Sequence, residues 1–375
     1  MKQFWRRVTE GLELNELWSQ FRADARSSYH LYSRNVDFTR APGVRRGRHF
    51  WSLVKQFFWA ILEQLSPARR VILLIALILL LFSGGVIFDE HSRGGVRVLV
   101  FDLRFFGGLL ILLLLVLEVA DRVVMKRDLQ IAREIQLWLV PGSPPKVPGM
   151  EIAFATRPAN TVAGDYYDVF PRQSPGEAAA QKFLFTVADV AGKSIPAALL
   201  MASFQASLKT LSSTPCSLAE LVDGMNRYVC TNSQSGLRFI TAVLAEYAPD
   251  TRTFTYINAG HNAPLLRRSS GKIERLETGG VPLGVKEDAT YQSASVTLEA
   301  GDWLAIFTDG LVEAANEREE EYGEQRMIAV LQGGASETAT TLMSRLMVDL
   351  DFFVGNNLPL ADDVTSMLIK AVVTP

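Results

Sequence analysis

The stretch Ala300–Glu313, AGDWLAIFTDGLVE, shows how the chemistry of this chain is built. Residues 304–307 form a short apolar run typical of a buried strand, and Thr308-Asp309-Gly310 follows, where the chain must turn. A carboxylate is therefore placed at the end of a buried strand. The same pattern recurs at Asp189, which ends FLFTVADV, and the pair Asp362-Asp363 precedes another strand-like run.

A fourth acidic corner is Asp165, which follows Gly164 in VAGDYYD. Several carboxylates on separate strands indicate a cluster of hard oxygen ligands for divalent cations, although Asp before Gly is also ordinary turn chemistry. Two such cations, about 3.5–4 Å apart, make a shared water nucleophilic and neutralise a phosphoryl group. Asp189 is the natural bridging ligand, and Asp309 and Asp362 complete the second ion. The predicted metal ligands are Asp165, Asp189, the Val190 carbonyl, Asp309, Asp362 and Asp363. Asp165 binds directly or through water, and Asp363 either ligates an ion or holds a water in the outer shell.

Apolar and basic residues are distributed unevenly along the chain. The sequence has 375 residues and is 48% hydrophobic, and the excess is concentrated in two nearly continuous apolar runs. Residues 1–70 carry 13 Lys and Arg against 6 Asp and Glu. A basic region beside apolar runs indicates attraction to anionic membrane lipid and not to nucleic acid. Cys216 and Cys230 lack metal-ligand spacing and are expected to be reduced thiols of a cytosolic domain.

The apolar runs predict a transmembrane hairpin over residues 67–120. Its spans are Val71–Phe88 and Phe105–Leu117, and the outer loop is Asp89–Arg97. Arg and Lys flank both outer ends of the hairpin, so the positive-inside rule predicts a multi-pass protein of the inner (cytoplasmic) membrane with the rest of the chain in the cytoplasm. A single span with a re-entrant segment is the alternative.

The flanking regions are interpreted from helical periodicity. Residues 1–66 form a basic cytoplasmic or interfacial region, in which Phe50–Leu65 reads as an amphipathic helix on the membrane or as a soluble core helix. Residues 121–148 form a linker whose helix is suited to homodimerisation or serves as an inert spacer. Its apolar seam consists of Met125, Leu129, Ala132, Ile135 and Leu139.

Residues 149–375 change character to short strands and connecting helices. Runs of strands separated by runs of helices favour an α+β layered domain over alternating βαβ units. The strand candidates are 151–157, 166–170, 182–189, 237–247, 253–258, 291–298, 303–308 and 364–373, and the helix candidates are 195–211, 218–232 and 338–354.

Six motifs, in order, resemble one known family. They are ARPANTVAGDYYDVF, DVAGKSIPAALLMA, INAGHNAPLL, GVPLGV, GDWLAIFTDGLVEAAN and ADDVT, and RDLQIAREIQLWLVP is similar to the linker that precedes the family's catalytic domain. Together they resemble the metal-dependent, protein phosphatase 2C-like family, and more narrowly its bacterial SpoIIE-type branch. The resemblance covers residues 127–373. Ala163 and Ser194 stand where the branch usually has glycine, which puts the local loop geometry in question.

The resemblance implies a four-layer αββα sandwich that binds two Mn²⁺ or Mg²⁺ ions. It implies hydrolysis of phosphoserine or phosphothreonine by a metal-activated water without a covalent phosphoenzyme. By position, Asp165 matches the acid of the GDYYD-like motif, Asp189 the bridging ligand, Asp309 the TDG acid and Asp362 the acid of the closing DD motif. By analogy, the substrate is a phosphoprotein such as a small anti-sigma-antagonist-like regulator.

Two further residues carry weaker predictions. His261 is placed to donate a proton to the leaving group or to fix its loop by a hydrogen bond. Arg157 would grip the substrate phosphate or is an ordinary surface arginine. The sequence thus predicts a membrane-anchored serine/threonine phosphatase with catalytic residues Asp165, Asp189, Asp309 and His261. The alternative is a catalytically silent scaffold of the same fold that binds a partner-switching regulator.

Overall fold

The computed structural model describes residues 59, 62, 65–81, 85–92, 95–172, 181–232, 238–355 and 360–373. The chain divides into two compact units, Met1–Val124 and Met125–Pro375. The amphipathic helix predicted over 50–65, and nearly all of region 1–66, lie outside the described residues. The four-part division made from the sequence stays a prediction.

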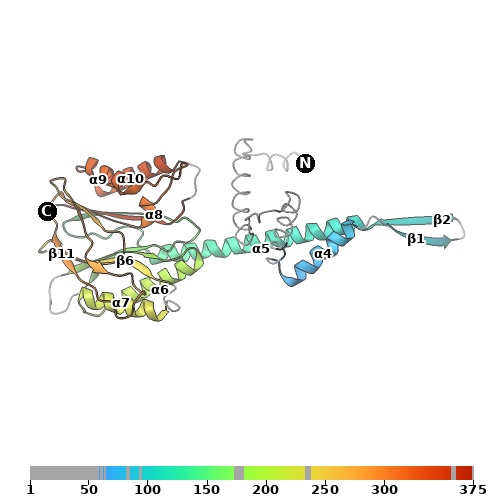
Figure 1. Ribbon diagram of the computed structural model, residues 1–375, viewed down its shortest axis with the longest axis horizontal. Helices are drawn as coiled ribbons and strands as arrows, with labels where there is room; N and C mark the ends of the chain where they lie inside the picture. Colours follow the sequence, from blue (N-terminus) through green and yellow to red (C-terminus); the bar gives the residue numbers. More distant parts are fainter. Residues whose placement is uncertain are drawn as a thin grey trace, which may run out of the picture. The chain divides into compact units, whose positions relative to one another are not determined.

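In the first unit, the described residues from 65 onward form one helix and the start of a second, joined by a β-ribbon (Figure 1). α4 (Pro67–Leu81) leads to the antiparallel strands β1 (Gly85–Ser92) and β2 (Gly95–Asp102), and α5 (Leu103–Leu139) follows. The prediction of a helical span to Phe88 is therefore wrong at its end, because the segment rich in β-branched residues after Gly85 is strand. The predicted outer loop lies in the same ribbon.

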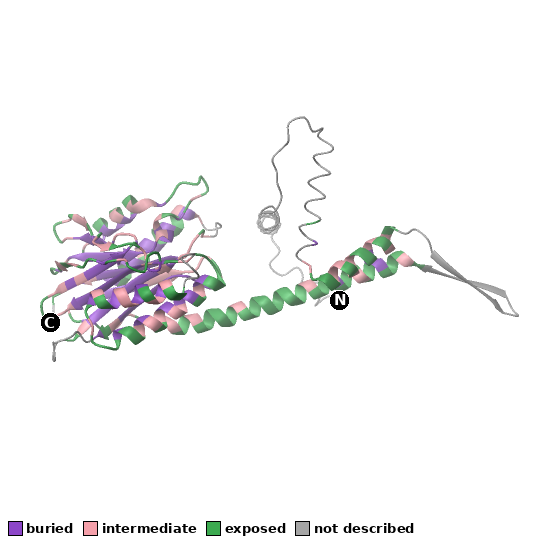
Figure 2. Ribbon diagram, turned by 60° about the horizontal axis from the view of Figure 1, so that its bottom comes forward, coloured by how far each residue is buried: buried purple, intermediate pink, exposed green. Residues whose placement is uncertain are grey.

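The two helices of the first unit pack closely near Gly107. A Cβ atom on Gly107 would lie 2.9 Å from the Ala76 carbonyl oxygen, so only glycine permits this approach. At the other end of α4, Arg69 forms an ion pair with Asp121 at 2.6 Å. Most apolar side chains of α4 and α5 are nevertheless exposed, as the green and pink helices of Figure 2 show.

One described helix, α5, is long and apolar enough to cross a membrane, with a mean hydropathy of 2.3 over its best window. α4 has 15 residues and falls short of that length. A multi-pass arrangement is therefore not supported by the part of the chain that the structure describes. The predicted second span and linker helix are one continuous helix, because no glycine or proline interrupts residues 109–139.

The second unit is built on two antiparallel-rich sheets. One has the order β10-β7-β6-β5-β4 with β11 paired to β7, and the other has the order β3-β13-β12-β8-β9. The strands are β3 (Met150–Arg157), β4 (Tyr166–Arg172), β5 (Lys182–Val190), β6 (Ile240–Ala248), β7 (Thr253–Ala259), β8 (Leu265–Arg267), β9 (Ile273–Arg275), β10 (Gly279–Gly280), β11 (Ala294–Thr297), β12 (Trp303–Phe307) and β13 (Val364–Ala371). All eight predicted strands are present.

Helices cover the outer face of each sheet (Figure 1). α6 (Ile195–Ser212) and α7 (Leu218–Asn232) pack on the first sheet, and α8 (Asp309–Val312), α9 (Gly323–Gly333) and α10 (Ala339–Val354) belong to the second. Alternation along β5 shows the layering: Phe185 enters the core between the sheets, whereas Leu184 enters the core under α6 and α7. The predicted αββα sandwich is confirmed, and this arrangement brings the strand ends that carry the acids to one edge.

The portion of α5 in the second unit, Met125–Leu139, presents most of its surface to solvent. Of the predicted dimer seam, Met125 and Ile135 are exposed, whereas Leu129 and Leu139 are half-buried. Trp138 is 79% exposed. This exposed apolar surface is available to a partner, and dimerisation through it stays a prediction.

Candidate active site

The corner after β12 is tightly packed. Thr308 is fully buried and occupies the position before α8, whose first residue is Asp309. A Cβ atom on Gly310 would lie 2.1 Å from the Asp363 carbonyl oxygen, so the backbone of this corner touches the backbone of the DD motif. Only glycine allows these two backbone segments to approach so closely. The contact fixes Asp309, the residue before Gly310, beside the DD motif, which is distant in sequence.

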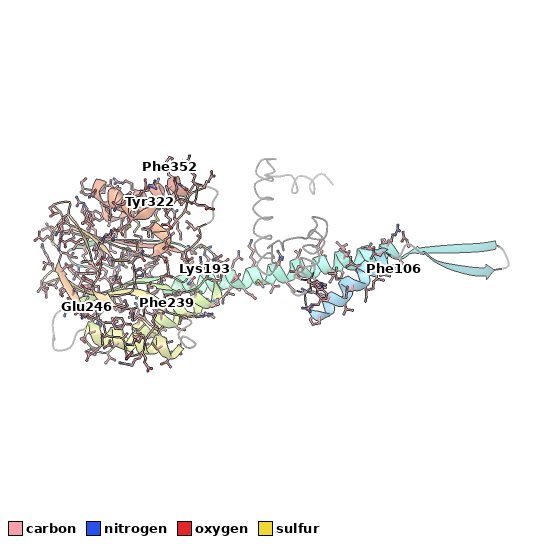
Figure 3. The ribbon with its side chains drawn as sticks, in the orientation of Figure 1. Phe106, Lys193, Phe239, Glu246, Tyr322 and Phe352 are labelled. Carbon is pink, nitrogen blue, oxygen red and sulfur yellow. The ribbon has the colours of Figure 1, made fainter. Side chains whose placement is uncertain are left out.

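The corner after β5 is open and strained. Asp189 is followed by Gly192 at φ 115° and Ser194 at φ 65° and ψ −147°, a backbone region that strongly favours glycine. The concern about Ser194 raised by the sequence is therefore confirmed. Lys193, labelled in Figure 3, places its ammonium 3.0 Å from an Asp362 carboxylate oxygen and donates to the Ala361 carbonyl at 2.6 Å. An ion pair thus ties the open corner to the DD motif.

Asp165 is the most buried acid of the cluster, with 4% of its surface exposed. Its carboxylate accepts a hydrogen bond from the Thr308 hydroxyl at 2.9 Å. That hydroxyl in turn accepts from the Thr365 backbone N–H at 3.0 Å. Asp165 is therefore oriented by the residue that directly precedes Asp309.

Both carboxylate oxygens of Asp363 accept hydrogen bonds from the backbone of the loop before Asp165. One accepts from the Ala159 N–H at 2.7 Å, and the other accepts from the Gly164 N–H at 2.6 Å. These contacts show that Asp363 supports the loop before Asp165, and its predicted roles as a ligand or as the holder of an outer-shell water stay predictions. Val190 is buried, and its carbonyl oxygen lies 3.2 Å from where a Cβ of Gly164 would be, so this carbonyl faces the same loop.

Burial and the charges of neighbouring acids raise the pKa values of the cluster. Burial raises the pKa of Asp189 to about 7, and the charges of Asp309 and Asp362 add to the effect. Burial also raises the pKa of Asp165 well above its usual range, with the charge of Asp189 as the next cause. The pKa of Asp309 is raised by burial and by Asp362. Such mutual effects require that these side chains lie close together, as the strand-end pattern predicts.

The donor set fits hard divalent cations. Buried carboxylates of like charge are unfavourable unless a cation neutralises them, and the Lys193 ammonium already sits against Asp362. Among the described residues, no three His, Cys, Asp or Glu side chains meet closely enough to hold an ion by themselves. Carbonyl and water oxygens would complete the coordination, as Mg²⁺ and Mn²⁺ allow.

His261 is buried and held by two neighbours. Its Nδ1 lies 2.8 Å from the Thr241 hydroxyl, and its backbone N–H donates to the Asn258 side chain at 2.7 Å. Thr241 pairs with Asp189 across β5 and β6, which places the imidazole beside the cluster. Burial lowers its pKa to about 4, so the ring is neutral at pH 7. This environment favours the loop-fixing role, and proton donation stays a prediction.

Arg157 lies at the end of β3, opposite Val364 in the register of β3 and β13. Both of its terminal nitrogens contact the Asp351 carboxylate of α10, and the Nη2 contact is 2.9 Å long. Phosphate binding by Arg157 stays a prediction, and it would have to compete with this ion pair.

Two residues at the site had no predicted role. Thr308 orients Asp165, and its position between a buried strand and Asp309 is the signal that marks it. Gln136 in α5 contacts the backbone of Ala163, beside Gly164 and Asp165. A polar residue on an otherwise apolar seam of the linker helix could have drawn attention to Gln136.

The comparisons with known proteins address this same domain. The profile of the family described as "Stage II sporulation protein E (SpoIIE)" matches residues 179–372, slightly more than half of the chain. The chain belongs to the SpoIIE family. The matched segment includes Asp189, Asp309 and Asp362 and begins after Asp165. Members of this family are metal-dependent.

The curated relatives of this SpoIIE-family chain include phosphoserine phosphatases. RsbU of Bacillus subtilis is 30% identical over 194 residues, which are 52% of this chain and 56% of that protein. The phosphoserine phosphatase RsbP of the same organism is 25% identical over 192 residues, covering 50% of this chain and 46% of the relative. The chain spans about half the length of the curated relatives it matches.

Solved structures confirm the fold. The SiaA-PP2C domain of Pseudomonas aeruginosa has a TM-score of 0.56 at 19% identity, and the match covers 67% of this chain and 98% of that domain. The RsbU and RsbW domains of a Mycobacterium tuberculosis protein give a TM-score of 0.53 at 24% identity, with 63% and 64% covered. The domain therefore has the PP2C-type fold.

Proposed function

We propose that this chain is a metal-dependent protein phosphatase that hydrolyses phosphoserine or phosphothreonine on a regulatory protein. The observation that carries the proposal is the gathering of Asp165, Asp189, Asp309 and Asp362 at one site, where the charge of Asp189 raises the pKa of Asp165, and those of Asp309 and Asp362 raise the pKa of Asp189. Two relatives named as phosphoserine phosphatases support it. We infer that the ions are two Mn²⁺ or Mg²⁺, because the cluster offers oxygen donors only.

Each residue of the cluster has a distinct task in this proposal. Two bound cations would supply a nucleophilic water and neutralise the phosphoryl oxygens. Asp189, Asp309 and Asp362 would bind the ions. Asp165, which is buried, would also contribute to binding them. Thr308 keeps the Asp165 carboxylate oriented by donating to it. The neutral imidazole of His261 stabilises the loop next to Asp189 through Thr241.

The decisive experiment is hydrolysis of p-nitrophenyl phosphate and of a phosphoserine peptide by the full chain in detergent, with Mn²⁺ and with EDTA. We expect turnover that requires Mn²⁺. Asp309→Asn removes ligand charge with little change in volume, so activity should fall more than about 100-fold, beyond the usual effect of an outer-shell residue.

The matched control for this variant is Asp250→Asn, the same change at an exposed residue of the β6–β7 turn. It should keep full activity. Circular dichroism should show that both variants are folded. Activity of Asp309→Asn near the parent level contradicts its role as a ligand. Absence of turnover in the parent at saturating Mn²⁺ would instead favour the silent scaffold.

We also propose that α5 attaches the enzyme to the cytoplasmic membrane, with the catalytic domain in the cytoplasm. The support is the apolar amino-terminal half of α5, most of which is exposed, followed by Arg122, Lys126 and Arg127. Contact with membrane lipid follows from this placement. The alternative of a soluble chain predicts that the protein stays in the supernatant after cell lysis without detergent.

We propose that two copies pair through the exposed part of α5 in the second unit. Ile131, Ile135 and Trp138 recur at spacings of four and three, and all three are exposed. Ile135→Glu places a charge in this stripe and should convert the detergent-solubilised dimer to a monomer in light scattering. Gln130→Glu, an exposed position on the same helix, is the control. Equal masses for Ile135→Glu and the parent contradict the pairing.

The substrate is proposed to be a small phosphoserine protein of the anti-sigma-antagonist type. This step rests on two relatives named phosphoserine phosphatases and on analogy with the family. Phosphoproteomics of cells expressing Asp309→Asn, compared with the parent, should identify the protein whose phosphoserine accumulates.

A further inference from the structure

The side chain of Gln136 in α5 pairs with the backbone of Ala163. Its Nε2 donates to the Ala163 carbonyl at 2.6 Å, and its Oε1 accepts from the Ala163 N–H at 3.0 Å. Ala163 is 6% exposed, so water cannot easily replace these bonds. A buried backbone group left without a partner costs about 1–3 kcal/mol, which makes this two-way contact a strong constraint on the loop.

The same loop is held from the opposite side by Asp363. Its carboxylate accepts from the backbone N–H groups of Ala159 and Gly164 at 2.7 and 2.6 Å. Gly164 also fits closely against the β5–α6 corner, because a Cβ there would lie 3.2 Å from both the Val190 carbonyl oxygen and the Ala197 Cβ. Segment 159–164 is thus fixed by the DD motif inside and by Gln136 from the linker helix.

Asp165 directly follows this segment, so its backbone position depends on both restraints. The Thr308 hydroxyl fixes the direction of the Asp165 carboxylate, but it does not fix where the Asp165 backbone lies. If the Gln136 amide withdraws, the loop keeps its bonds to Asp363 and its packing against the β5–α6 corner, but it loses the restraint at Ala163. The Asp165 carboxylate, which also interacts with that of Asp189, is then held less firmly beside the other acids.

Glutamine suits this position for a chemical reason. Only an amide offers a donor and an acceptor in the spacing of a peptide group, and asparagine is shorter by one methylene. The neighbouring positions on α5 do not share this contact: Ile135 is 48% exposed and Leu137 is 55% exposed. Gln136 is half-buried and points into the domain.

We propose that Gln136 is a positioning residue, which holds the Ala163–Asp165 segment so that Asp165 contributes to metal binding. The inference rests on the proposed function and adds that the position of the linker helix sets the affinity for the metal. A shift of α5 by one turn, about 5.4 Å, would remove the amide from Ala163 and weaken metal binding without touching an acidic ligand.

The test uses the full chain in detergent and Mn²⁺ as the probe. Free Mn²⁺ is measured by electron paramagnetic resonance during titration of the parent and of Gln136→Met, which keeps the side-chain length and loses both hydrogen bonds. The Kd for Mn²⁺ should rise about 10-fold or more, the range found when an outer-shell partner is removed. Gln130→Met, an exposed position on the same helix, should leave the Kd unchanged.

Kinetics separate positioning from general loss of structure. For Gln136→Met, the Mn²⁺ concentration at half-maximal hydrolysis of p-nitrophenyl phosphate should rise, whereas kcat at saturating Mn²⁺ and KM for the ester should stay within about twofold of the parent. A merely structural role would lower the Tm in EDTA and leave the Kd for Mn²⁺ unchanged.

The remaining outcomes each decide one proposal. A parent chain that binds no Mn²⁺ refutes the proposed function. A parent that binds Mn²⁺ as tightly as Gln136→Met overturns the role of Gln136 alone. If Gln136→Met does not fold, Gln136→Asn provides the same test, because it keeps the amide but withdraws it by one methylene. An unchanged Kd in that folded variant also overturns the inference.

Discussion

The corner after β12 and the corner after β5 deliver Asp309 and Asp189 to the same cluster, but they are built differently. The first is closed: its glycine touches the backbone of the DD motif. The second is open: no atom lies within 4 Å of a Cβ built on Gly192, and the restraint comes from backbone strain and from the ion pair of Lys193. Asp309 is therefore fixed by close backbone packing, whereas Asp189 is held by strand pairing in β5 and is followed by a strained turn that has room to move.

The largest effect that tests this contrast is expected from Gly310→Ala. A methyl group there would overlap the Asp363 carbonyl, so we expect the domain to lose about 1–3 kcal/mol of stability, as overpacked sites do. Mn²⁺ binding should weaken as well, because Asp363 supports the loop before Asp165. Differential scanning calorimetry and Mn²⁺ titration measure the two effects.

Gly192→Ala is the matched change at the open corner. It meets no neighbouring atom, and its cost of about 1–2 kcal/mol should come only from the positive φ. A larger loss at Gly192 than at Gly310 would show that the closed corner can relax, and the contrast between the two corners would then be wrong.

The second largest effect is expected in the pH dependence of stability, which reports on the acidic side chains at both corners. A group whose pKa is raised on folding stabilises the protein below its unfolded pKa and loses that contribution as the pH rises through its folded pKa. For Asp189, folding raises the pKa from 3.8 to about 7. In EDTA, the Tm should therefore fall between about pH 4 and pH 7, by about 2–4 °C for each kcal/mol in a domain of this size.

Bound Mn²⁺ should remove most of this slope, because the cation neutralises the acids. Asp189→Asn is the control in EDTA, since it deletes one of the titrating acids and should reduce the slope. Asp165 and Asp309, whose pKa values are also raised, should keep the remainder. A parent protein whose Tm has the same pH profile in EDTA and in Mn²⁺ would contradict a shared metal cluster.

The smallest expected effect is a gain in stability from a substitution of Ser194. Ser194 at φ 65° occupies a conformation that costs a residue other than glycine about 1–3 kcal/mol. Ser194→Gly should raise the stability by about 1 kcal/mol in chemical denaturation. Ser213→Gly, at the other end of α6 with φ −73°, is the control and should not stabilise. Equal effects of the two changes would show that the open corner stores no strain.

The sequence was most informative where local pattern and burial agree. Residues 304–307 and FLFTVADV are apolar because both faces of their strands are covered, so the run itself predicts the strand. Asp309, Asp189 and Asp165 could be predicted together because glycines and strand ends mark where the chain turns. The three-residue strands β8 and β9 were missed because they are too short to show a period.

Other features depend on contacts that no single stretch encodes. The hydropathy of 71–88 hides the change from helix to strand after Leu81, since Val, Ile and Phe suit both a span and a ribbon. The role of Gln136 depends on Ala163, a residue 27 positions away whose backbone happens to be buried. Asp363 looked like a ligand, and only its two backbone partners show that it supports the loop.

The position of β13 has a consequence for how the enzyme is made. This strand lies between β3 and β12, pairing with the first strand of the domain over eight residues and with β12 over five. The DD motif and this interior strand are thus synthesised after every other strand of the domain that the structure describes. A nascent chain on the ribosome cannot gather its acids until translation has passed β13, so a product truncated before β13 would lack both a complete sheet and the assembled acid cluster.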